Sequence, residues 1–399
     1  MKALADLVVL DLTHMLAGPF GAMLLADLGA TTIKVEPPGR GEATRRLLEN
    51  DPVHSLNGVG AYFLTLNRNK KSVAIDLKSP DGLALFYELV KKADILFSNF
   101  GPGVNERLGI DHQTLAAHNP RIITCSVSGF GETGPGADRP AFDMVAQGYG
   151  GGMSITGFPG GPPTKAGIPV GDLGGGIFGT LGILAALHAR ERTGRGQHVD
   201  ISMQDCQISL LTYMATMYLL SGQEIGAMGN THFRHIPYNT YPTRDRHIIL
   251  ACVTDQAWCN VAKVIGDPEL ADPALAALPG RAAKRAWFEA RLAEVLKTET
   301  CDFWLARFAE ADVPAAPVND FGHALSDPQI LARNMVVDVP QPEGGTVRMP
   351  GNPIKLSETG DESFSPSPRL GQHTDDVLRG LLDKTAAEIA SLRTRGVVQ

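Results

Sequence analysis

Short runs of β-branched and apolar residues alternate with helical segments through the first 200 residues, and this alternation constrains the fold more than any other feature of the chain. A strand–helix–strand repeat at this spacing is typical of a parallel sheet with helices on both faces. One expected helix, residues 19–28, ends at Gly29, and another begins near Ser79-Pro80. We therefore expect an α/β fold. The expected strands are residues 7–12, 31–36, 72–77, 94–98, 121–127 and 198–203.

The character of the sequence changes beyond Gly222, after a long apolar helix expected at residues 204–221. Residues 247–253 are typical of a strand, and residues 256–310 are typical of several helices with Lys, Glu and Ala at exposed positions. A chain of 399 residues is also longer than one ordinary hydrophobic core supports. We expect a smaller α+β domain at residues 225–325, beside a larger domain that holds the parallel sheet.

The charge balance argues against a general nucleic-acid-binding protein. The formal net charge is -7 and the pI is near 5.9, whereas such proteins show a strong basic patch. The five cysteines form no C-x-x-C pair, which favours reduced thiols over disulfides or a metal site. No signal peptide is evident, and the most apolar stretch, residues 173–187, is shorter than a membrane span. We expect a cytoplasmic protein that binds neither nucleic acid nor membrane and holds no metal.

An aspartate, Asp172, precedes a glycine-rich helix that begins with Leu173 and three glycines. This placement has two interpretations. Asp172 can be a helix N-cap, whose carboxylate accepts hydrogen bonds from the first amides of the helix. It can also be a nucleophilic carboxylate, with the amides of the neighbouring glycines stabilising an oxyanion. Three glycines in a row weaken a helix, so they need a packing or functional reason.

The same glycines also satisfy the dinucleotide-binding pattern G-x-G-x-x-G, through Gly174, Gly176 and Gly179. That pattern requires a strong strand immediately before it and an acidic residue ~20 positions later. The preceding run is short and is broken by Pro169, although Asp200 stands where an acidic partner could lie. A nicotinamide oxidoreductase therefore remains an alternative.

Several short motifs along the chain, which end in Met349-Pro350-Gly351-Asn352-Pro353, together resemble the family III CoA-transferases. The resemblance implies a Rossmann-like large domain of residues 1–224 and 326–399, a small domain of residues 225–325, and a homodimer of interlocked rings. The likeness is strongest to the oxalate-directed members, which implies oxalate as acceptor and acetyl-CoA or formyl-CoA as donor. The other motifs are Asp11-Leu12-Thr13-His14, Ala17-Gly18-Pro19, Ile33-Lys34-Val35-Glu36-Pro37, Asn67-Arg68-Asn69-Lys70-Lys71-Ser72, Asn99-Phe100-Gly101-Pro102-Gly103, Glu106-Arg107-Leu108-Gly109, Ser128-Gly129-Phe130-Gly131 and Thr193-Gly194-Arg195-Gly196-Gln197.

The resemblance also assigns site residues. Asp172 matches the nucleophile of the family, which forms a mixed anhydride and then an aspartyl-CoA thioester. No tightly bound cofactor is implied, because coenzyme A enters as the acyl-CoA co-substrate. The residues expected at the oxyanion or the acceptor are Gly174, Gly175, Gly176, Gly229, Asn230, His14 and Asp143. The residues expected at coenzyme A are Met15, Leu16, Arg40, Ile75, Lys78, Asn99, Phe100, Gly101, Arg107 and Arg139.

Two departures from the family pattern and two alternatives accompany this assignment. Leu16 stands where an oxalate-selective relative has glutamine, and Pro37 stands where another relative has a cofactor-binding arginine, so Arg40 is expected to replace it. The α-methylacyl-CoA racemases share the fold, but they need a proton-carrying histidine where this chain has Phe142. A non-enzymatic CoA-binding module is the alternative from another class, and it would leave Asp172 without a chemical role.

Overall fold

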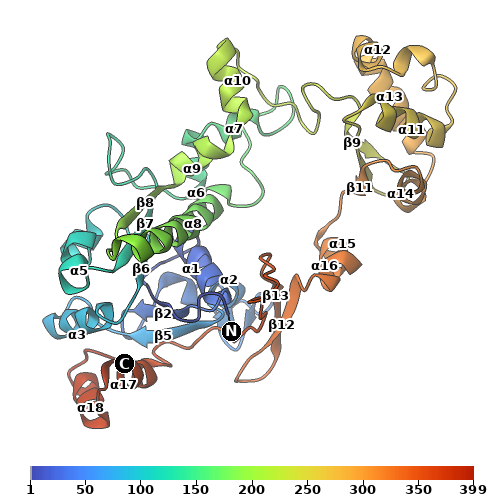
Figure 1. Ribbon diagram of the computed structural model, residues 1–399. Helices are drawn as coiled ribbons and strands as arrows, with labels where there is room; N and C mark the ends of the chain where they lie inside the picture. Colours follow the sequence, from blue (N-terminus) through green and yellow to red (C-terminus); the bar gives the residue numbers. More distant parts are fainter. Residues whose placement is uncertain (1) are drawn as a thin grey trace. The chain divides into compact units, whose positions relative to one another are not determined.

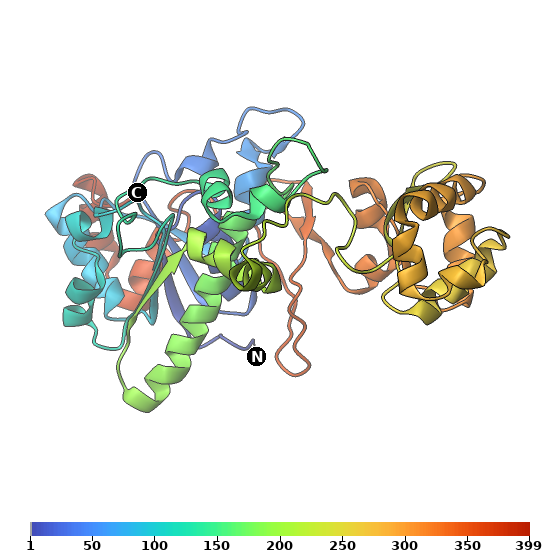
Figure 2. The same ribbon diagram turned by 90° about the horizontal axis from the view of Figure 1, so that it is seen from above.

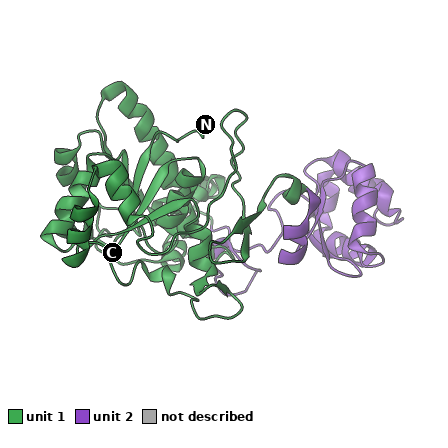
Figure 3. Ribbon diagram, turned by 90° about the horizontal axis from the view of Figure 1, so that it is seen from below, with its two compact units in different colours: residues 1–153, 165–223, 329–399 green, residues 154–164, 224–328 purple. Residues whose placement is uncertain are grey.

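The computed structural model describes residues 2–399, which form two compact units (Figure 3). Unit 1 contains the residues up to 153, residues 165–223 and residues 329–399. Unit 2 contains residues 154–164 and 224–328. The small domain expected from the sequence, residues 225–325, overlaps the longer segment of unit 2. Unit 2 also contains residues 154–164, which were not expected in it.

Unit 1 is built on a six-stranded parallel sheet with the strand order β5-β2-β1-β6-β7-β8 (Figure 1). The crossover connections run through helices, as parallel strands require. This arrangement confirms the expected α/β fold. The strands are β1 (Val8–Asp11), β2 (Thr31–Glu36), β5 (Lys70–Ala74), β6 (Ile95–Ser98), β7 (Ile123–Ser128) and β8 (His198–Ser202).

Successive residues of each strand serve two different cores, because side chains alternate between the faces of a sheet. On β1, Val9 packs on one face with helices α1 (Ala17–Asp27) and α8 (Val170–Thr193). Leu10 packs on the other face. The helices that cover that second face are α3 (Pro80–Val90), α5 (His112–His118), α17 (Thr374–Leu382) and α18 (Ala386–Thr394) (Figure 2).

The C-terminal segment closes the edge of the sheet along β5. The Ser72 amide donates to Nδ1 of His373 at 3.2 Å, and the His373 amide donates back to the Ser72 carbonyl at 2.9 Å. Further along, the Asp76 amide donates to the Val397 carbonyl, and Ile75 pairs with Val398 in an antiparallel bridge. The edge strand therefore has few free backbone groups to offer another chain.

Two helices differ from the expectations. The apolar stretch at residues 173–187, which is shorter than a membrane span, lies in the 24-residue helix α8, which by length and composition alone could cross a membrane. It packs against the sheet and α1, as a core helix does. The single helix expected at residues 204–221 is two helices, α9 (Met203–Leu210) and α10 (Tyr213–Ser221). They are separated at Thr212, whose φ is +51° and is incompatible with a continuous helix.

Unit 2 contains a three-stranded antiparallel sheet with the order β11-β10-β9 and a set of helices. Its core is rich in aromatic residues, among them Trp258, Phe288 and Trp304. Arg281 is buried beneath it, donating to the carbonyls of Ile236, Leu275 and Ala276. The elements of this unit are β9 (Tyr238–Pro242), β10 (His247–Ala251), α11 (Asp255–Ile265), η2 (Pro273–Leu275), α12 (Leu278–Ala283), α13 (Arg285–Leu296), α14 (Cys301–Glu310), β11 (Ala315–Pro317) and α15 (Phe321–Ser326).

The remaining elements are short. They are η1 (Ala43–Arg45), β3 (Ser55–Leu56), β4 (Val59–Gly60), α2 (Ala61–Leu66), α4 (Val104–Leu108), α6 (Asp143–Tyr149), α7 (Gly152–Ile155), α16 (Pro328–Ala332), β12 (Val336–Pro340) and β13 (Thr346–Pro350).

Candidate active site

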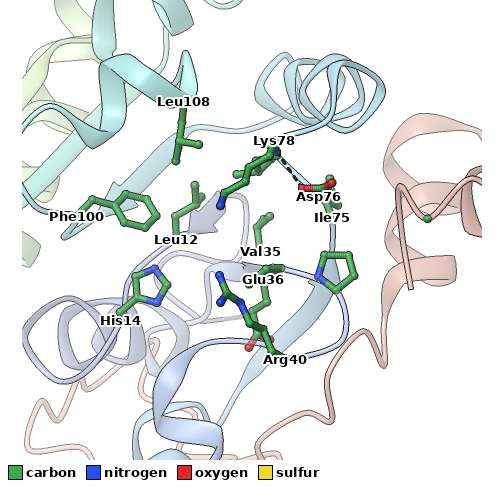
Figure 4. Close-up of a pocket in the computed structure, with 14 residues that line it drawn as sticks. Leu12, His14, Val35, Glu36, Arg40, Ile75, Asp76, Lys78, Phe100 and Leu108 are labelled. Carbon is green, nitrogen blue, oxygen red and sulfur yellow. Dashed lines mark hydrogen bonds between the residues drawn. The ribbon is translucent and has the colours of Figure 1, made fainter.

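A pocket of about 400 Å³ lies in unit 1 at the carboxyl ends of β1, β2, β5 and β6, where open parallel sheets bind their ligands. The side chains of Arg40 and Lys78 enter it from opposite sides, and His14 and Phe100 line a third side (Figure 4). Apolar residues such as Ile75 and Leu108 form the rest of the wall. An apolar slot with two cations at its mouth suits a flat base that carries phosphate groups.

Glu36 also lines this pocket, but its charge is already balanced. Arg45 donates to both of its carboxylate oxygens at 2.6 Å, and Ser72 donates to it at 2.7 Å. Burial would raise the pKa of Glu36, but the hydrogen bonds and charge of Arg45, the charge of Lys34 and the bond from Ser72 together hold it below its usual value. Neither Arg40 nor Lys78 makes an ion pair within residues 2–399, so the positive charges of both side chains are available to a ligand in this pocket.

The structure brings together some of the residues expected at coenzyme A and not others. Five of the expected site residues line the pocket, namely His14, Arg40, Ile75, Lys78 and Phe100. Six residues expected at coenzyme A do not line it, namely Met15, Leu16, Asn99, Gly101, Arg107 and Arg139. Of these, Asn99 has its side chain bonded to the backbone of His14, and Arg139 lies with its guanidinium 5.9 Å from the ring centre of Tyr149.

The loop between β1 and α1 is fixed by a buried charged cluster beneath it. Asp11 accepts from the Thr13 amide at 2.9 Å and from Lys70 at 2.8 Å, and Lys34 donates to the Thr13 carbonyl at 2.8 Å. Burial would raise the pKa of Asp11, but the two lysines lower it to about 2. Burial lowers the pKa of Lys70 to about 8 against the attraction of Asp11. Burial also lowers the pKa of His14, so its ring is neutral near pH 7.

Asp172 lies inside the first turn of α8, which corrects the expectation that it precedes the helix. The helix begins at Val170 with Pro169 as its N-cap. The capping carboxylate comes instead from Asp143 at the start of α6. Its Oδ1 accepts from the Gly171 amide at 2.8 Å and from the Asp172 amide at 3.3 Å. The side chain of Asp172 therefore does not cap α8, and the interpretation of Asp172 as an N-cap is wrong.

The Asp172 carboxylate is poorly solvated and lies near a second acid. Burial, followed by the negative charge of Asp143, raises its pKa from 3.8 to about 6. Within residues 2–399, no side chain or amide donates a hydrogen bond to this carboxylate. A carboxylate that is ionised at neutral pH, lacks donors and is partly removed from water is a stronger nucleophile than a solvated one.

The three glycines after Asp172 serve helix packing, which corrects their expected role as oxyanion donors. Gly174, Gly175 and Gly176 lie beyond the first turn of α8, where each amide donates to the carbonyl four residues earlier. A Cβ atom on Gly176 would lie 2.6 Å from the carbonyl oxygen of Ala17, and one on Gly175 would lie 2.8 Å from Val127. The glycines therefore let α8 approach α1 and β7 closely.

The N-terminus of α1 offers other donors, which the sequence did not single out. The two helices run side by side with their N-termini at the same end, since Gly176 meets Ala17 and Thr180 donates to the Gly21 carbonyl. No side chain caps α1, although the first amides of a helix have no partner inside it. The small residues Ala17 and Gly18 at this end were the available signal.

A tyrosine, Tyr62 on α2, is a further residue that sequence reasoning missed. Burial and then the charges of Asp172, Glu42 and Asp143 raise its pKa to about 12, so its hydroxyl keeps its proton at neutral pH. A protonated hydroxyl can donate a hydrogen bond. Nothing in its local sequence marked it, because its importance depends on residues 110 positions away.

Two expected site residues, Gly229 and Asn230, belong to unit 2. The Gly229 amide donates to the Gly157 carbonyl at 2.8 Å, and the Asn230 side chain donates to Thr240 at 2.8 Å. The amide of Gly229 is thus engaged in this structure, and the part of this loop at the active site stays a prediction. Within residues 2–399, no cluster of three or more His, Cys, Asp or Glu side chains could hold a metal ion.

Comparisons with known proteins agree on one family. Residues 4–374 match the model of CoA-transferase family III. The chain is 42% identical over 369 residues to acetyl-CoA:oxalate CoA-transferase of Acetobacter aceti, covering 92% of each chain. It is 37% identical to succinyl-CoA–D-citramalate CoA-transferase of Chloroflexus aurantiacus, covering 100% of this chain and 98% of the relative. A crystal structure of a CAIB/BAIF family protein from Brucella suis superposes with a TM-score of 0.86 at 37% identity, covering 95% of this chain and 99% of that one.

Proposed function

Since this chain belongs to CoA-transferase family III, we propose that it moves coenzyme A from a short acyl-CoA to a small dicarboxylic acid, with Asp172 as the nucleophile. The observation that carries the proposal is the Asp172 carboxylate itself. It projects from the first turn of α8, makes no hydrogen bond within residues 2–399, and has a pKa raised to about 6 by burial and Asp143. At neutral pH it is mostly ionised and ready to attack.

The transfer proceeds by four exchanges at carbonyl carbons. The Asp172 carboxylate attacks the acyl-CoA, the C–S bond breaks, and a mixed anhydride and CoA thiolate form. The thiolate attacks the Asp172 carbonyl, which releases the donor acid and leaves an aspartyl-CoA thioester. The acceptor carboxylate attacks this thioester and expels the thiolate again, giving a second mixed anhydride. The thiolate then attacks the acceptor carbonyl, so that acceptor-CoA leaves and Asp172 returns to its carboxylate form.

Each exchange passes through an oxyanion that needs fixed donors, and losing one such donor typically costs ~10²–10³ in rate. The uncapped N-terminus of α1 and the hydroxyl of Tyr62 are the donors that we assign to it in unit 1. The helix dipole of α1 adds a favourable field for negative charge at the same point. The apolar pocket with Arg40 and Lys78 holds the nucleotide part of coenzyme A.

Acetyl-CoA or formyl-CoA is the proposed donor and oxalate the first acceptor to test. The names of two relatives give oxalate and D-citramalate, both dicarboxylic acids, as their substrates. A dianionic acceptor beside Asp172 and Asp143 needs donors for its second carboxylate, because like charges at short range repel. Neutral hydrogen-bond donors are available for it at α1. The side chain of Leu16 cannot form a hydrogen bond with the acceptor. We therefore expect weaker selection for oxalate than a polar side chain at this position would give.

We also propose a homodimer. Helix α10 has an almost wholly apolar sequence, YMATMYLLS, yet none of its residues is buried. Leu219 and Leu220 are 80% and 84% exposed, and Ile177 and Leu181 of α8 are more than half exposed. A helix that is apolar all round is normally covered. A second copy of the chain is the occupant that the family resemblance supplies.

An acyl-CoA exchange assay followed by mass spectrometry tests the function. Acetyl-, formyl- and succinyl-CoA are each incubated with oxalate, formate and other small acids, and new acyl-CoA species are measured. We expect oxalyl-CoA from acetyl-CoA or formyl-CoA with the wild-type chain and none with Asp172→Asn, which keeps the shape but not the nucleophile. Near-normal turnover by Asp172→Asn would refute the mechanism. Preference for succinate over oxalate by tenfold or more would refute the acceptor and leave the reaction type intact.

A further inference from the structure

The side-chain amide of Asn99 is bonded at both ends to one residue, His14. Asn99 follows β6 directly and His14 lies three residues after β1, and these strands are neighbours in the sheet. The His14 amide donates to Oδ1 of Asn99 at 2.7 Å, and Nδ2 of Asn99 donates to the His14 carbonyl at 2.8 Å. The carboxamide thus pairs with the His14 peptide groups as a neighbouring strand would.

This pairing ties Oδ1 of Asn99 and one N–H of its amino group to the His14 backbone. A carboxamide has one carbonyl oxygen and one amino group, and here both serve the His14 backbone. His14 and Phe100 line the pocket, whereas Asn99 does not. The side chain of Asn99 therefore holds the His14 backbone, and its expected contact with coenzyme A stays a prediction.

The contacts around His14 show what the pairing controls. The peptide groups of Thr13 are fixed from below by Asp11 and Lys34. The only side chain within residues 2–399 that bonds to the peptide groups of His14 is Asn99. The imidazole ring lies with its centre 4.9 Å from that of Phe100, in the wall of the pocket. The position of this ring depends on how the His14 backbone is held.

We propose that Asn99 is a positioning residue that acts through His14, whose ring it holds against Phe100 at the acyl-CoA pocket. The proposal rests on the proposed function, because it takes coenzyme A as the ligand of this pocket. Loss of the two hydrogen bonds between the Asn99 side chain and the His14 backbone should weaken coenzyme A binding on the order of tenfold. Replacing Asn99 should no longer weaken coenzyme A binding when His14 has already been changed to alanine.

A double-mutant cycle measured as coenzyme A affinity tests this prediction. The dissociation constant is determined by isothermal titration calorimetry for the wild-type chain, His14→Ala, Asn99→Ala and the double variant. We expect each single change to weaken binding about tenfold, and the double variant to bind no more than about twofold more weakly than His14→Ala. Effects that multiply to about 100-fold would show that Asn99 acts independently of the His14 side chain, and would overturn the proposal.

Two further variants keep the test decisive. Asn119→Ala is the matched control, since the Asn119 side chain donates to the carbonyls of Val90 and Ala93 at 2.9 Å, away from the pocket lining. It should leave coenzyme A affinity unchanged; a comparable loss would mean that any such asparagine matters only for folding, and would overturn the proposal.

If Asn99→Ala does not fold, the cycle is run with Asn99→Asp, which keeps the acceptor for the His14 amide but loses the donor to its carbonyl. The cycle with Asn99→Asp is judged by the same criterion: effects of the two changes on the dissociation constant that multiply would overturn the proposal, and effects that do not multiply would support it. A wild-type chain that binds no coenzyme A would overturn the proposed function together with this inference, whereas binding with multiplicative effects would overturn the inference alone.

Discussion

Neutralising Asp143 should move the acid limb of the pH–rate profile. Asp172 must be ionised to attack, and its pKa of about 6 means that only about one-tenth of the molecules carry the nucleophile at pH 5. Asp143→Asn keeps the oxygen that accepts from the amides of Gly171 and Asp172 but removes the charge that disfavours ionisation of Asp172. The pKa of Asp172 should therefore fall, and activity should persist to lower pH.

The size of this change follows from the two causes of the raised pKa. Burial is the larger cause and Asp143 the smaller, so neutralisation should remove less than half of the rise from 3.8 to about 6. The midpoint of the acid limb should move by about 0.5 to 1 pH unit toward acid, to between about 5 and 5.5. At pH 5 the ionised fraction then grows from about one-tenth to between about a quarter and a half, which is a gain of roughly two- to fivefold relative to the plateau.

The measurement is kcat/KM for acetyl-CoA between pH 4.5 and 8, with each variant normalised to its own plateau because a weaker cap can lower the plateau itself. Asp111→Asn is the matched control. Asp111 caps α5 through the Thr114 amide at 3.0 Å and is not among the groups that act on Asp172. It should leave the midpoint where it is. An Asp143→Asn midpoint that stays in place or moves to higher pH would refute the electrostatic role of Asp143.

Three further outcomes are expected. Gly176→Ala should lower the free energy of unfolding by ~1–3 kcal/mol in a urea titration, because its Cβ would lie 2.6 Å from the Ala17 carbonyl oxygen and 3.2 Å from the Gly21 amide, which cannot rotate away. Gly380→Ala, on the open face of α17, should instead raise it by ~0.5–1 kcal/mol, and equal effects of the two would contradict the packing role. In sedimentation experiments at nanomolar concentration the folded chain should remain a dimer, and a folded monomer would exclude the interlocked assembly. Leu219→Ser with Leu220→Ser should weaken or prevent its formation, since both side chains are exposed in the single chain.

The six-stranded sheet was largely predictable from the sequence, because most of its strands contain short runs of apolar and β-branched residues between helix signals. The strand expected at residues 72–77 is β5, Lys70–Ala74, whose first two residues are lysines and gave no strand signal. The strand at residues 31–36 was expected with the bounds that β2 has in the structure. The strand β11 was missed, since Ala315–Pro317 is too short and too poor in β-branched residues to give a signal. The break at Thr212 was also missed, because an apolar run of helical length carries no local mark of a turn.

At the candidate site, residue types were easier to predict than their partners. Asp172 stood out beside its glycines, but whether it caps α8 depended on Asp143, which lies 29 residues earlier. The role of the glycines depended likewise on Ala17, which comes close to Gly176 only after both helices pack on the sheet. His14, Arg40 and Lys78 lie on different strand–helix connections, and only the parallel order of the strands brings them to one pocket.

The closure of the sheet edge by the C-terminal segment has a consequence for how the chain is made. Ser72 on β5 bonds to His373, which lies 301 residues later. At ~5–20 residues per second, a ribosome needs roughly 15 to 60 s to cover that distance. Once β8 (His198–Ser202) has been made, all six strands of the sheet can pair, while the side of β5 that bonds to residues 371–399 stays open. The nascent chain therefore carries an unprotected strand for most of its synthesis, and cells that overproduce it should need chaperones during elongation more than after release.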